Sequence, residues 1–86
     1  MSESLLDFPC DFPVKVMGRK ATGFREVIVA LVEAHAGTLD AGRVSLRESR
    51  DGNFIALTIM LRAESQAQLD AIYSELSAHD QVLMAL

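Results

Sequence analysis

Large aliphatic residues alternate with mixed residues through positions 53–63, and the rest of the chain is arranged around this stretch. Its odd positions are aliphatic: Ile55, Leu57, Ile59 and Leu61. Because successive side chains of a strand point to opposite faces, one face of this segment is apolar and the other is mixed. Asp51-Gly52 precedes the segment, as in a hairpin turn. We therefore predict a central strand that needs helices on its aliphatic face.

Two segments have the spacing of helices that could cover this face. The first carries apolar residues every three or four positions and ends in a histidine: Phe24, Val27, Ile28, Leu31, Val32 and His35. We expect Thr22 or Gly23 to cap the start of this helix and Gly37 to stop it. The second follows Ser65-Gln-Ala-Gln68, which has the form of a capping box. Its apolar stripe comprises Leu69, Ile72, Tyr73 and Leu76.

Shorter alternating segments predict three further strands. They are a first strand over residues 12–18 with Pro13 at its beginning, an edge strand around Val44 and Leu46, and a last strand from Val82 to Leu86. With right-handed crossovers, this order gives a ferredoxin-like βαββαβ α/β sandwich, with a four-stranded antiparallel sheet and two helices on one face. The first and third strands should be central neighbours. We expect a single domain over residues 1–86, with residues 1–11 as a partly ordered lead-in.

Composition narrows the setting of the protein. The 86 residues include eight Lys and Arg against twelve Asp and Glu, a net charge of −4. This charge opposes nonspecific attraction to nucleic acid or to an anionic membrane. The single cysteine, Cys10, cannot form an intrachain disulfide, and the N-terminal residues lack the basic start and apolar run of a secretory signal. The longest apolar run, residues 54–61, is too short to cross a bilayer. We expect a cytoplasmic protein without a membrane partner.

The sequence contains no strong catalytic motif. It has no Walker loop, no paired cysteines, no His-x-x-x-His and no glycine-flanked nucleophilic serine. His35 and His79 stand at the predicted helix ends, where a cation favours the helix dipole. Cys10 lies among apolar and acidic neighbours and is expected to be a small buried hydrophobe. We expect no enzyme activity, no catalytic residues, no metal site and no cofactor.

One segment resembles a catalytic loop incompletely. Residues 18–25, Gly-Arg-Lys-Ala-Thr-Gly-Phe-Arg, resemble the phosphate-cradling loop of acylphosphatases, which share the predicted fold. The loop is one residue short, and Glu48 stands where that family has its catalytic asparagine. A carboxylate there would repel a phosphate, so we disfavour an acylphosphatase-like enzyme. Anion binding by Arg19, Lys20 and the helix N-terminus remains a weaker alternative to a solvated basic loop.

The uncovered face of the sheet is a second candidate region. Four basic residues stand at strand positions that alternate with the core positions, so they should point away from the helices: Lys15, Arg43, Arg47 and Arg62. The same parity places six apolar residues there: Met17, Phe54, Ala56, Met60, Leu83 and Ala85. An ordinary solvated face of long side chains is the plainer interpretation, and a ligand site is the alternative. Sheet-type RNA binding needs aromatics on both central strands, and Phe54 alone qualifies.

The residues Leu6-Asp-Phe-Pro-Cys-Asp-Phe-Pro-Val-Lys-Val-Met-Gly18, with Asp51-Gly-Asn-Phe54 at the hairpin, carry a family resemblance. Over nearly the whole chain, the sequence resembles the small bacterial DUF493 family (UPF0250, YbeD-like). Phe54 stands where many members are expected to have tyrosine. The resemblance implies a ferredoxin-like fold similar to the ACT-type regulatory domains of metabolic enzymes. It implies no established activity and no catalytic residues.

Together these features predict an uncharacterised, non-catalytic regulatory or interaction domain. Its partner would be an acidic protein or a small metabolite, and the loop of residues 18–23 could contribute to metabolite binding. The alternative is a weak anion or nucleic-acid binder that uses the basic sheet face, although nucleic acid is not favoured. Seven residues are the candidate contacts: Lys15, Arg19, Lys20, Arg43, Arg47, Phe54 and Arg62. Because two such faces would set like charges together, we expect a monomer or a weak homodimer.

Overall fold

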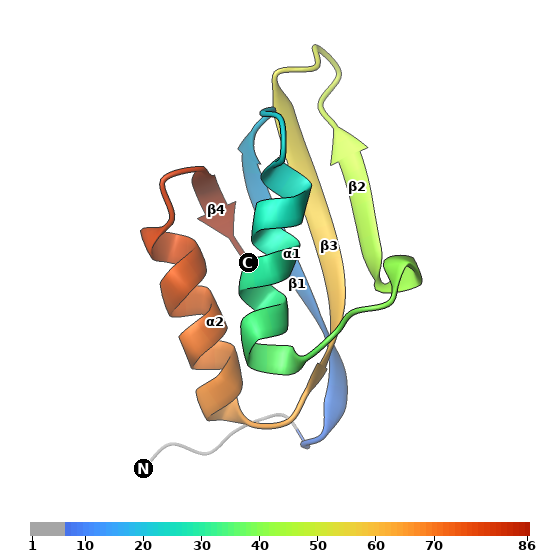
Figure 1. The fold of residues 1–86 in the computed structure, drawn as a ribbon, viewed down its shortest axis with the longest axis vertical. Coiled ribbons are helices and arrows are strands. Elements are labelled where there is room, and N and C mark those ends of the chain that lie inside the picture. The colour runs from blue at the N-terminus through green and yellow to red at the C-terminus, as the bar shows by residue number, and fades with distance from the viewer. Residues whose placement is uncertain (1–6) are drawn as a thin grey trace.

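The computed structural model describes residues 7–86, which form four strands, two α-helices and one short 3-10 helix (Figure 1). In chain order these are β1 (Cys10–Arg19), α1 (Phe24–Ala36), η1 (Ala41–Arg43), β2 (Val44–Glu48), β3 (Phe54–Ala63), α2 (Gln66–Ala78) and β4 (Val82–Ala85). The strands make one antiparallel sheet in the order β2-β3-β1-β4. The predicted ferredoxin-like βαββαβ fold is therefore confirmed, with the first and third strands as central neighbours.

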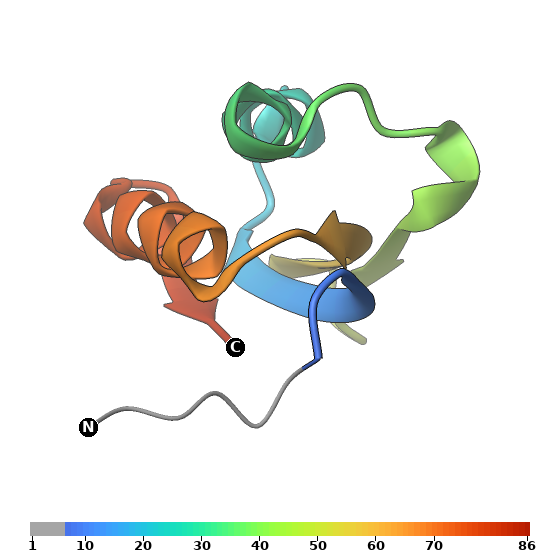
Figure 2. The same cartoon turned by 90° about the horizontal axis from the view of Figure 1, so that it is seen from below.

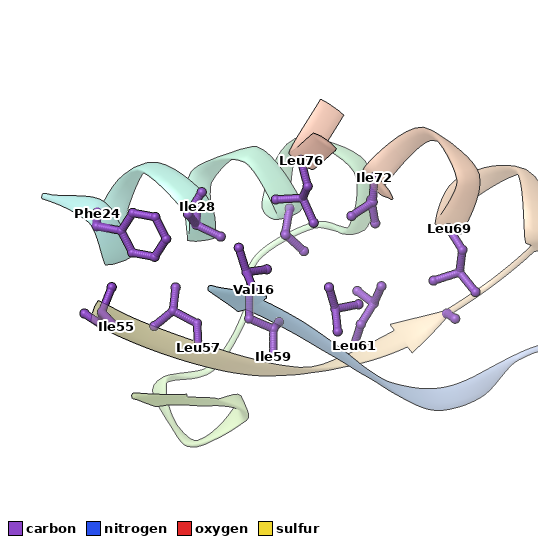
Figure 3. Close-up of a cluster of buried hydrophobic side chains, with 13 residues drawn as sticks. Val16, Phe24, Ile28, Ile55, Leu57, Ile59, Leu61, Leu69, Ile72 and Leu76 are labelled. Atoms are coloured by element: carbon purple, nitrogen blue, oxygen red, sulfur yellow. The ribbon is translucent and has the colours of Figure 1, made fainter. Parts of the chain in front are cut away.

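Strands β1 and β3 pair along their full length, from Cys10 opposite Ala63 to Arg19 opposite Phe54. Both helices lie on the same side of this sheet (Figure 2). The odd positions of β3 face the helices, as the alternation predicts, and all of them are buried. They pack against Phe24, Ile28 and Val32 of α1 and against Leu69, Ile72 and Leu76 of α2 (Figure 3).

The buried stripe of α1 is narrower than the sequence pattern predicts. Phe24, Ile28 and Val32 are spaced four residues apart and form one row over the sheet, whereas Val27 is 42% exposed. With 3.6 residues per turn, only one row of side chains faces a sheet directly, and its flanking rows are partly in solvent. The core therefore consists of a single row from each helix above the central strands.

Hydrogen bonds connect the C-terminal end of α1 to residues of α2. The Gln68 N–H donates to Ser65 Oγ at 3.1 Å, which confirms half of the predicted capping box. Instead of closing on Ser65, the Gln68 side chain accepts from the Glu64 N–H and donates to the carbonyl of His35. His35 Nε2 in turn lies 2.6 Å from Glu75 Oε2. The C-terminal end of α1 is thus fixed to α2 by polar contacts as well as by packing.

The first strand is longer than the alternation suggests. It runs from Cys10 to Arg19 rather than from residue 12 to 18, so the expected lead-in already contributes two strand residues. The part of that expected lead-in before Asp7 lies outside the described residues. Pro13 is the fourth residue of the strand, not its beginning. The backbone of Pro13 has the same orientation as that of Lys15, whose N–H and C=O bond to Leu86. The position of the missing N–H of Pro13 therefore lies past the end of the described pairing with β4.

The last strand departs from simple alternation. Met17 pairs with Met84 but Gly18 pairs with Val82, so the register shifts and Leu83 is the extra residue. Gly18 also lies under the first turn of α1, where a Cβ atom would come within 3.0 Å of the Phe24 ring and of the Gln81 carbonyl oxygen. The close approach of these two elements explains why a residue without a side chain is present at this position.

Candidate functional site

The side of the sheet away from the helices is the candidate site, and we call it the open sheet face. No helix or strand within residues 7–86 covers it (Figure 2). Its strand residues are those that pair at the non-core positions: Asp11, Pro13, Lys15, Met17 and Arg19 of β1, Ser45 and Arg47 of β2, Phe54, Ala56, Thr58, Met60 and Arg62 of β3, and Met84 of β4. Arg43, at the end of η1, continues the row at the β2 edge.

The register shift between β1 and β4 is a β-bulge, and it changes the placement of two residues predicted to lie on this face. Ala85 lies opposite the buried Val16 and packs against the core, so its placement on the open sheet face was wrong. Met84 takes that place, opposite Met17. Leu83 is the unpaired bulge residue and is 55% exposed. Parity counted along a sequence fails at a bulge, because the extra residue exchanges the two faces for every position after it.

At one end of the face, a single carboxylate serves two guanidinium groups. Asp11 Oδ1 lies 3.2 Å from Arg43 Nη1 and 3.7 Å from Arg62 Nη1. Arg43 also donates to the carbonyl oxygen of Met60 at 3.3 Å. Asp11 was not a predicted site residue, although it shares the parity of Lys15 and Met17 and the pattern could have found it. This cluster partly neutralises two of the seven candidate contacts.

Lys15 lies on the central strand β1 and Arg47 on the edge strand β2, and both differ from Arg43 and Arg62 in their charge contacts. Within residues 7–86, neither has a carboxylate at ion-pair distance. Both line a hollow of about 400 Å³, together with the hydroxyl-bearing Ser45 and Thr58. Their Cα atoms are about 12 Å apart, because β3 lies between their strands and their partners on β3, Thr58 and Ala56, are two residues apart. The hollow thus combines two positive charges with two hydrogen-bonding side chains.

An apolar hollow of about 180 Å³ adjoins this one and shares Arg47 and Ala56 with it. Met17 and Phe54 provide its apolar lining on the open sheet face. The Arg19 guanidinium carbon lies 5.6 Å from the centre of the Phe54 ring, within the range of a cation–π contact. Along the strands, the face therefore has three regions: the Arg19–Phe54 pair at one end, the hollow with Lys15 and Arg47 in the middle, and the cluster around Asp11 at the other end.

Charged residues are divided unevenly between the open sheet face and the rest of the protein. The face and its β2 edge carry five basic residues, Lys15, Arg19, Arg43, Arg47 and Arg62, and among residues 7–86 one acidic residue, Asp11, so that 5 − 1 gives +4. The whole chain has a net charge of −4. The surface outside this face is correspondingly acidic. A local basic patch thus exists on an acidic protein.

The loop of residues 18–23 does not bring its two cations together. Arg19 belongs to the open sheet face, whereas Lys20 Nζ lies 3.1 Å from Glu48 Oε2, and Glu48 pairs with the core residue Ile55. The Lys20 N–H donates to the Asn53 carbonyl, so this amide is also occupied. Gly23 is the N-cap residue of α1, and no side chain of the described residues caps this end of the helix. In the segment that resembles an acylphosphatase loop, one of the two cations is thus already paired with a carboxylate of β2.

The remaining candidate groups have structural contacts. His35 bonds to Glu75, and His79 Nδ1 accepts from the Gln81 N–H at 3.1 Å. Cys10 is half-buried and packs against the core. Among the described residues, no group of three or more His, Cys, Asp or Glu could hold a metal ion. Each of these residues has a contact that accounts for its position without a chemical role.

Two groups near the ends of the sheet have shifted pKa values. A hydrogen bond from the Ser49 hydroxyl, and then one from the Asn53 N–H, lower the pKa of Asp51 from its ordinary value of 3.8. Asp51 is exposed and organises the β2–β3 turn. Burial raises the pKa of Tyr73, whose ring meets Phe12 edge-on at 6.5 Å. Neither group lies in the basic hollow.

None of the helices in residues 7–86 has the length and apolar character needed to cross a membrane.

The chain matches a protein family and several of its relatives along nearly its whole length. The model of the family described as "Protein of unknown function (DUF493)" matches residues 3–86. A UPF0250 protein of Paraburkholderia phytofirmans is 45% identical over 86 residues, covering 100% of this chain and 97% of the relative. A UPF0250 protein of Ralstonia nicotianae is 45% identical over 84 residues, covering 98% and 87%, and one of Nitrosomonas europaea is 39% identical over 84 residues, covering 98% and 97%.

Proposed function

Because this chain belongs to the DUF493 family, which is described as being of unknown function, we propose a function from the site itself. We propose that the protein is a non-catalytic regulatory or interaction domain whose open sheet face binds a negatively charged protein or metabolite. One observation carries the proposal. Lys15 and Arg47 line the same hollow and have no carboxylate partner among residues 7–86.

The electrostatics of this pair favour an anion. Two like charges facing one hollow repel each other, and a bound carboxylate or phosphate replaces that repulsion with two attractions. Arg43 and Arg62, by contrast, already share Asp11. The hydroxyls of Ser45 and Thr58 offer additional donors to an anion's oxygen atoms. The acidic remainder of the chain would meanwhile keep other anions from binding elsewhere on the surface.

The proposal is tested with fluorescently labelled polyglutamate, titrated at low and at moderate salt. We expect binding to wild type at low salt that weakens as salt is added, because screening acts on exposed charges. The double variant Lys15→Glu/Arg47→Glu should abolish it. The matched control, Arg25→Glu/Arg50→Glu, makes the same change in net charge on residues outside the open sheet face and should still bind. If both double variants lose binding equally, total charge rather than this site explains it.

Nucleic acid is the second anion to test in the same titration. Among the described open-face residues of β1 and β3, Phe54 is the one aromatic side chain, and stacking of successive bases needs more. We therefore expect labelled single-stranded RNA to bind no more tightly than polyglutamate of equal charge. Markedly tighter RNA binding would favour the nucleic-acid alternative.

A non-catalytic role is part of the proposal, and it also has a direct test. The two cations of residues 18–23 have different contacts, because Arg19 lies over the Phe54 ring and Lys20 is paired with Glu48. We expect purified protein to leave model acyl phosphates and esters unhydrolysed. Turnover that disappears in Arg19→Ala would contradict this part of the proposal.

The charge of the face also bears on self-association. Two copies meeting face to face would bring Lys15 and Arg47 against their own counterparts, and burying unpaired cations costs more than the apolar contacts return. We propose a monomer or a weak homodimer. Sedimentation at decreasing concentrations measures this, and a homodimer that survives dilution would show that the charges do not control the face.

A further inference from the structure

The methionines of the described residues all lie on the open sheet face. Met17, Met60 and Met84 are 40%, 37% and 49% exposed, and the half-buried Phe54 lies on the same face. Methionine is flexible and polarisable, so it adapts to the side chains of a partner. Methionine, arginine and aromatic residues are also the residue types enriched at protein interfaces. The composition of the face therefore indicates a protein partner more than a small anion.

The order of these residues along the sheet limits what the partner can be. One apolar row contains Met84, Met17 and Ala56, and the basic row beside it contains Lys15, Thr58 and Ser45. Arg47 lies opposite Ala56 and lines the hollow shared with the basic row. A second apolar row follows, with Met60 opposite Pro13. A partner lying along the strands would meet apolar, then positive, then apolar surface.

The distance between the two apolar rows matches a helix. Ala56 and Met60 are four strand residues apart, which corresponds to about 13 Å at roughly 3.3 Å per residue. An α-helix covers a similar distance in about eight residues at about 1.5 Å each. Residues at i, i+4 and i+7 or i+8 lie on one side of a helix. A helix along the strands could therefore place an apolar residue over each row and a carboxylate over the basic centre between them.

We propose, on the basis of the anion-binding function above, that the partner is an amphipathic acidic helix of a different protein. Its recognised side would carry large apolar residues at i and at i+7 or i+8, with Asp or Glu at i+3 or i+4. The apolar residues contact Met17, Met84 and Phe54 at one end and Met60 at the other. The acidic residue pairs with Lys15 and Arg47.

A second copy of this chain does not fit this description. Helix α2 has no Lys or Arg and exposes Asp70 and Glu75, but no large apolar residue of this helix is exposed. In α1, Val27 is the one large apolar residue that is exposed. Neither described helix thus presents two large apolar residues on both sides of a carboxylate. The described helices of a second copy therefore do not supply the required helix.

The test is a selection from displayed random peptides of about 18 residues, roughly five helical turns. Wild-type protein is the target at low salt, and Lys15→Glu/Arg47→Glu is the counter-target. We expect enriched peptides to carry the apolar–acidic–apolar spacing described above. One such peptide, made synthetically, should become helical on binding, retain its affinity for Arg25→Glu/Arg50→Glu, and bind Lys15→Glu/Arg47→Glu at least about tenfold more weakly.

The methionine methyl groups locate the bound peptide. In protein labelled with ¹³C at these methyls, the signals of Met17, Met60 and Met84 should all shift when the peptide is added. A rearranged peptide of the same composition without the helical spacing is the matched control and should shift them little.

Three results would overturn the inference. Enriched acidic peptides without apolar periodicity, bound through Lys15 and Arg47 with unshifted methionines, would leave the anion-binding function standing and remove the helix. Enriched peptides with apolar residues at every second position would indicate a strand instead. If no enriched peptide distinguishes wild type from Lys15→Glu/Arg47→Glu, both the inference and the proposed function are contradicted.

Discussion

The two faces of the sheet are built from the same strands but are stabilised differently. On the helix side, Leu57, Ile59 and Leu61 of β3 are fully buried beneath α1 and α2. On the other side, the residues between them, Thr58 and Met60, are half-buried or exposed and lie among arginines and a lysine. Burial of apolar surface dominates folding energetics, whereas exposed charges contribute little. The helix side therefore holds the fold, and the open sheet face can be changed with little loss of stability.

The largest expected effect comes from truncating a core side chain. Leu57→Ala should lower the free energy of unfolding by about 3 kcal/mol, because it removes buried methyl groups and leaves a cavity. Thr58→Ala, the next residue on the opposite face, should change it by less than about 0.5 kcal/mol. Urea denaturation of both variants measures the difference. Equal losses would contradict the division between the two faces.

Gly18 tests the contact that brings β1, α1 and the loop before β4 together. Gly18→Ala places a methyl group against the Phe24 ring and the Gln81 carbonyl, and we expect a loss of about 2 kcal/mol from overpacking. Gly42→Ala is the matched control, because a Cβ atom there meets nothing within 4 Å. Its stability should stay within about 0.5 kcal/mol of wild type. If Gly18→Ala is equally neutral in thermal or urea unfolding, the close approach at Gly18 does not constrain the fold.

The smallest expected effect concerns the turn that joins the edge strand β2 to β3. The Ser49 hydroxyl and the Asn53 N–H lower the pKa of Asp51 below 3.8, so its charged form stabilises the fold above that pH. This contribution is lost as the pH falls through the lowered pKa of the folded state. Asp51→Asn should be slightly less stable than wild type at neutral pH, and the difference should vanish in acid.

Urea midpoints at neutral pH and at steps below 3.8 measure this contribution. Asp80→Asn serves as the control, because the Asp80 side chain makes no hydrogen bond to another side chain within residues 7–86. A gap between Asp51→Asn and wild type that persists in acid would mean that the turn does not depend on the carboxylate charge.

Much of the fold could be predicted from sequence because alternation and helical spacing record burial directly. The odd positions of residues 53–63 identified the core face of β3, and Ser65 with Gln68 identified the start of α2. The start of β1 at Cys10 was missed because Pro13 was placed at the beginning of the strand, although a proline is tolerated inside a strand where its missing N–H faces no partner. The face of β4 was misassigned at Ala85 because a bulge leaves no mark in an apolar sequence.

The candidate site could be predicted less completely. Parity correctly gathered Lys15, Arg47, Phe54 and Arg62 on one face of the sheet. It could not show which cations are paired, because the contacts of Asp11 with Arg43 and Arg62 join residues far apart in the chain. The pairing of Lys20 with Glu48 and that of His35 with Glu75 were missed for the same reason. Long-range ion pairs depend on the register of the sheet and the packing of the helices. The pattern of apolar and polar residues in one sequence does not specify either of these.

The central claim is that the open sheet face, at Lys15 and Arg47, is where this protein binds acidic partners. A titration of ¹⁵N-labelled protein with polyglutamate at low salt tests it residue by residue. The predicted result is a set of amide shifts centred on Lys15, Arg47, Ala56 and Thr58 that decreases as salt is added. Shifts centred instead on residues 18–23 or on the exposed side of α1, or shifts that persist unchanged in Lys15→Glu/Arg47→Glu, would contradict it.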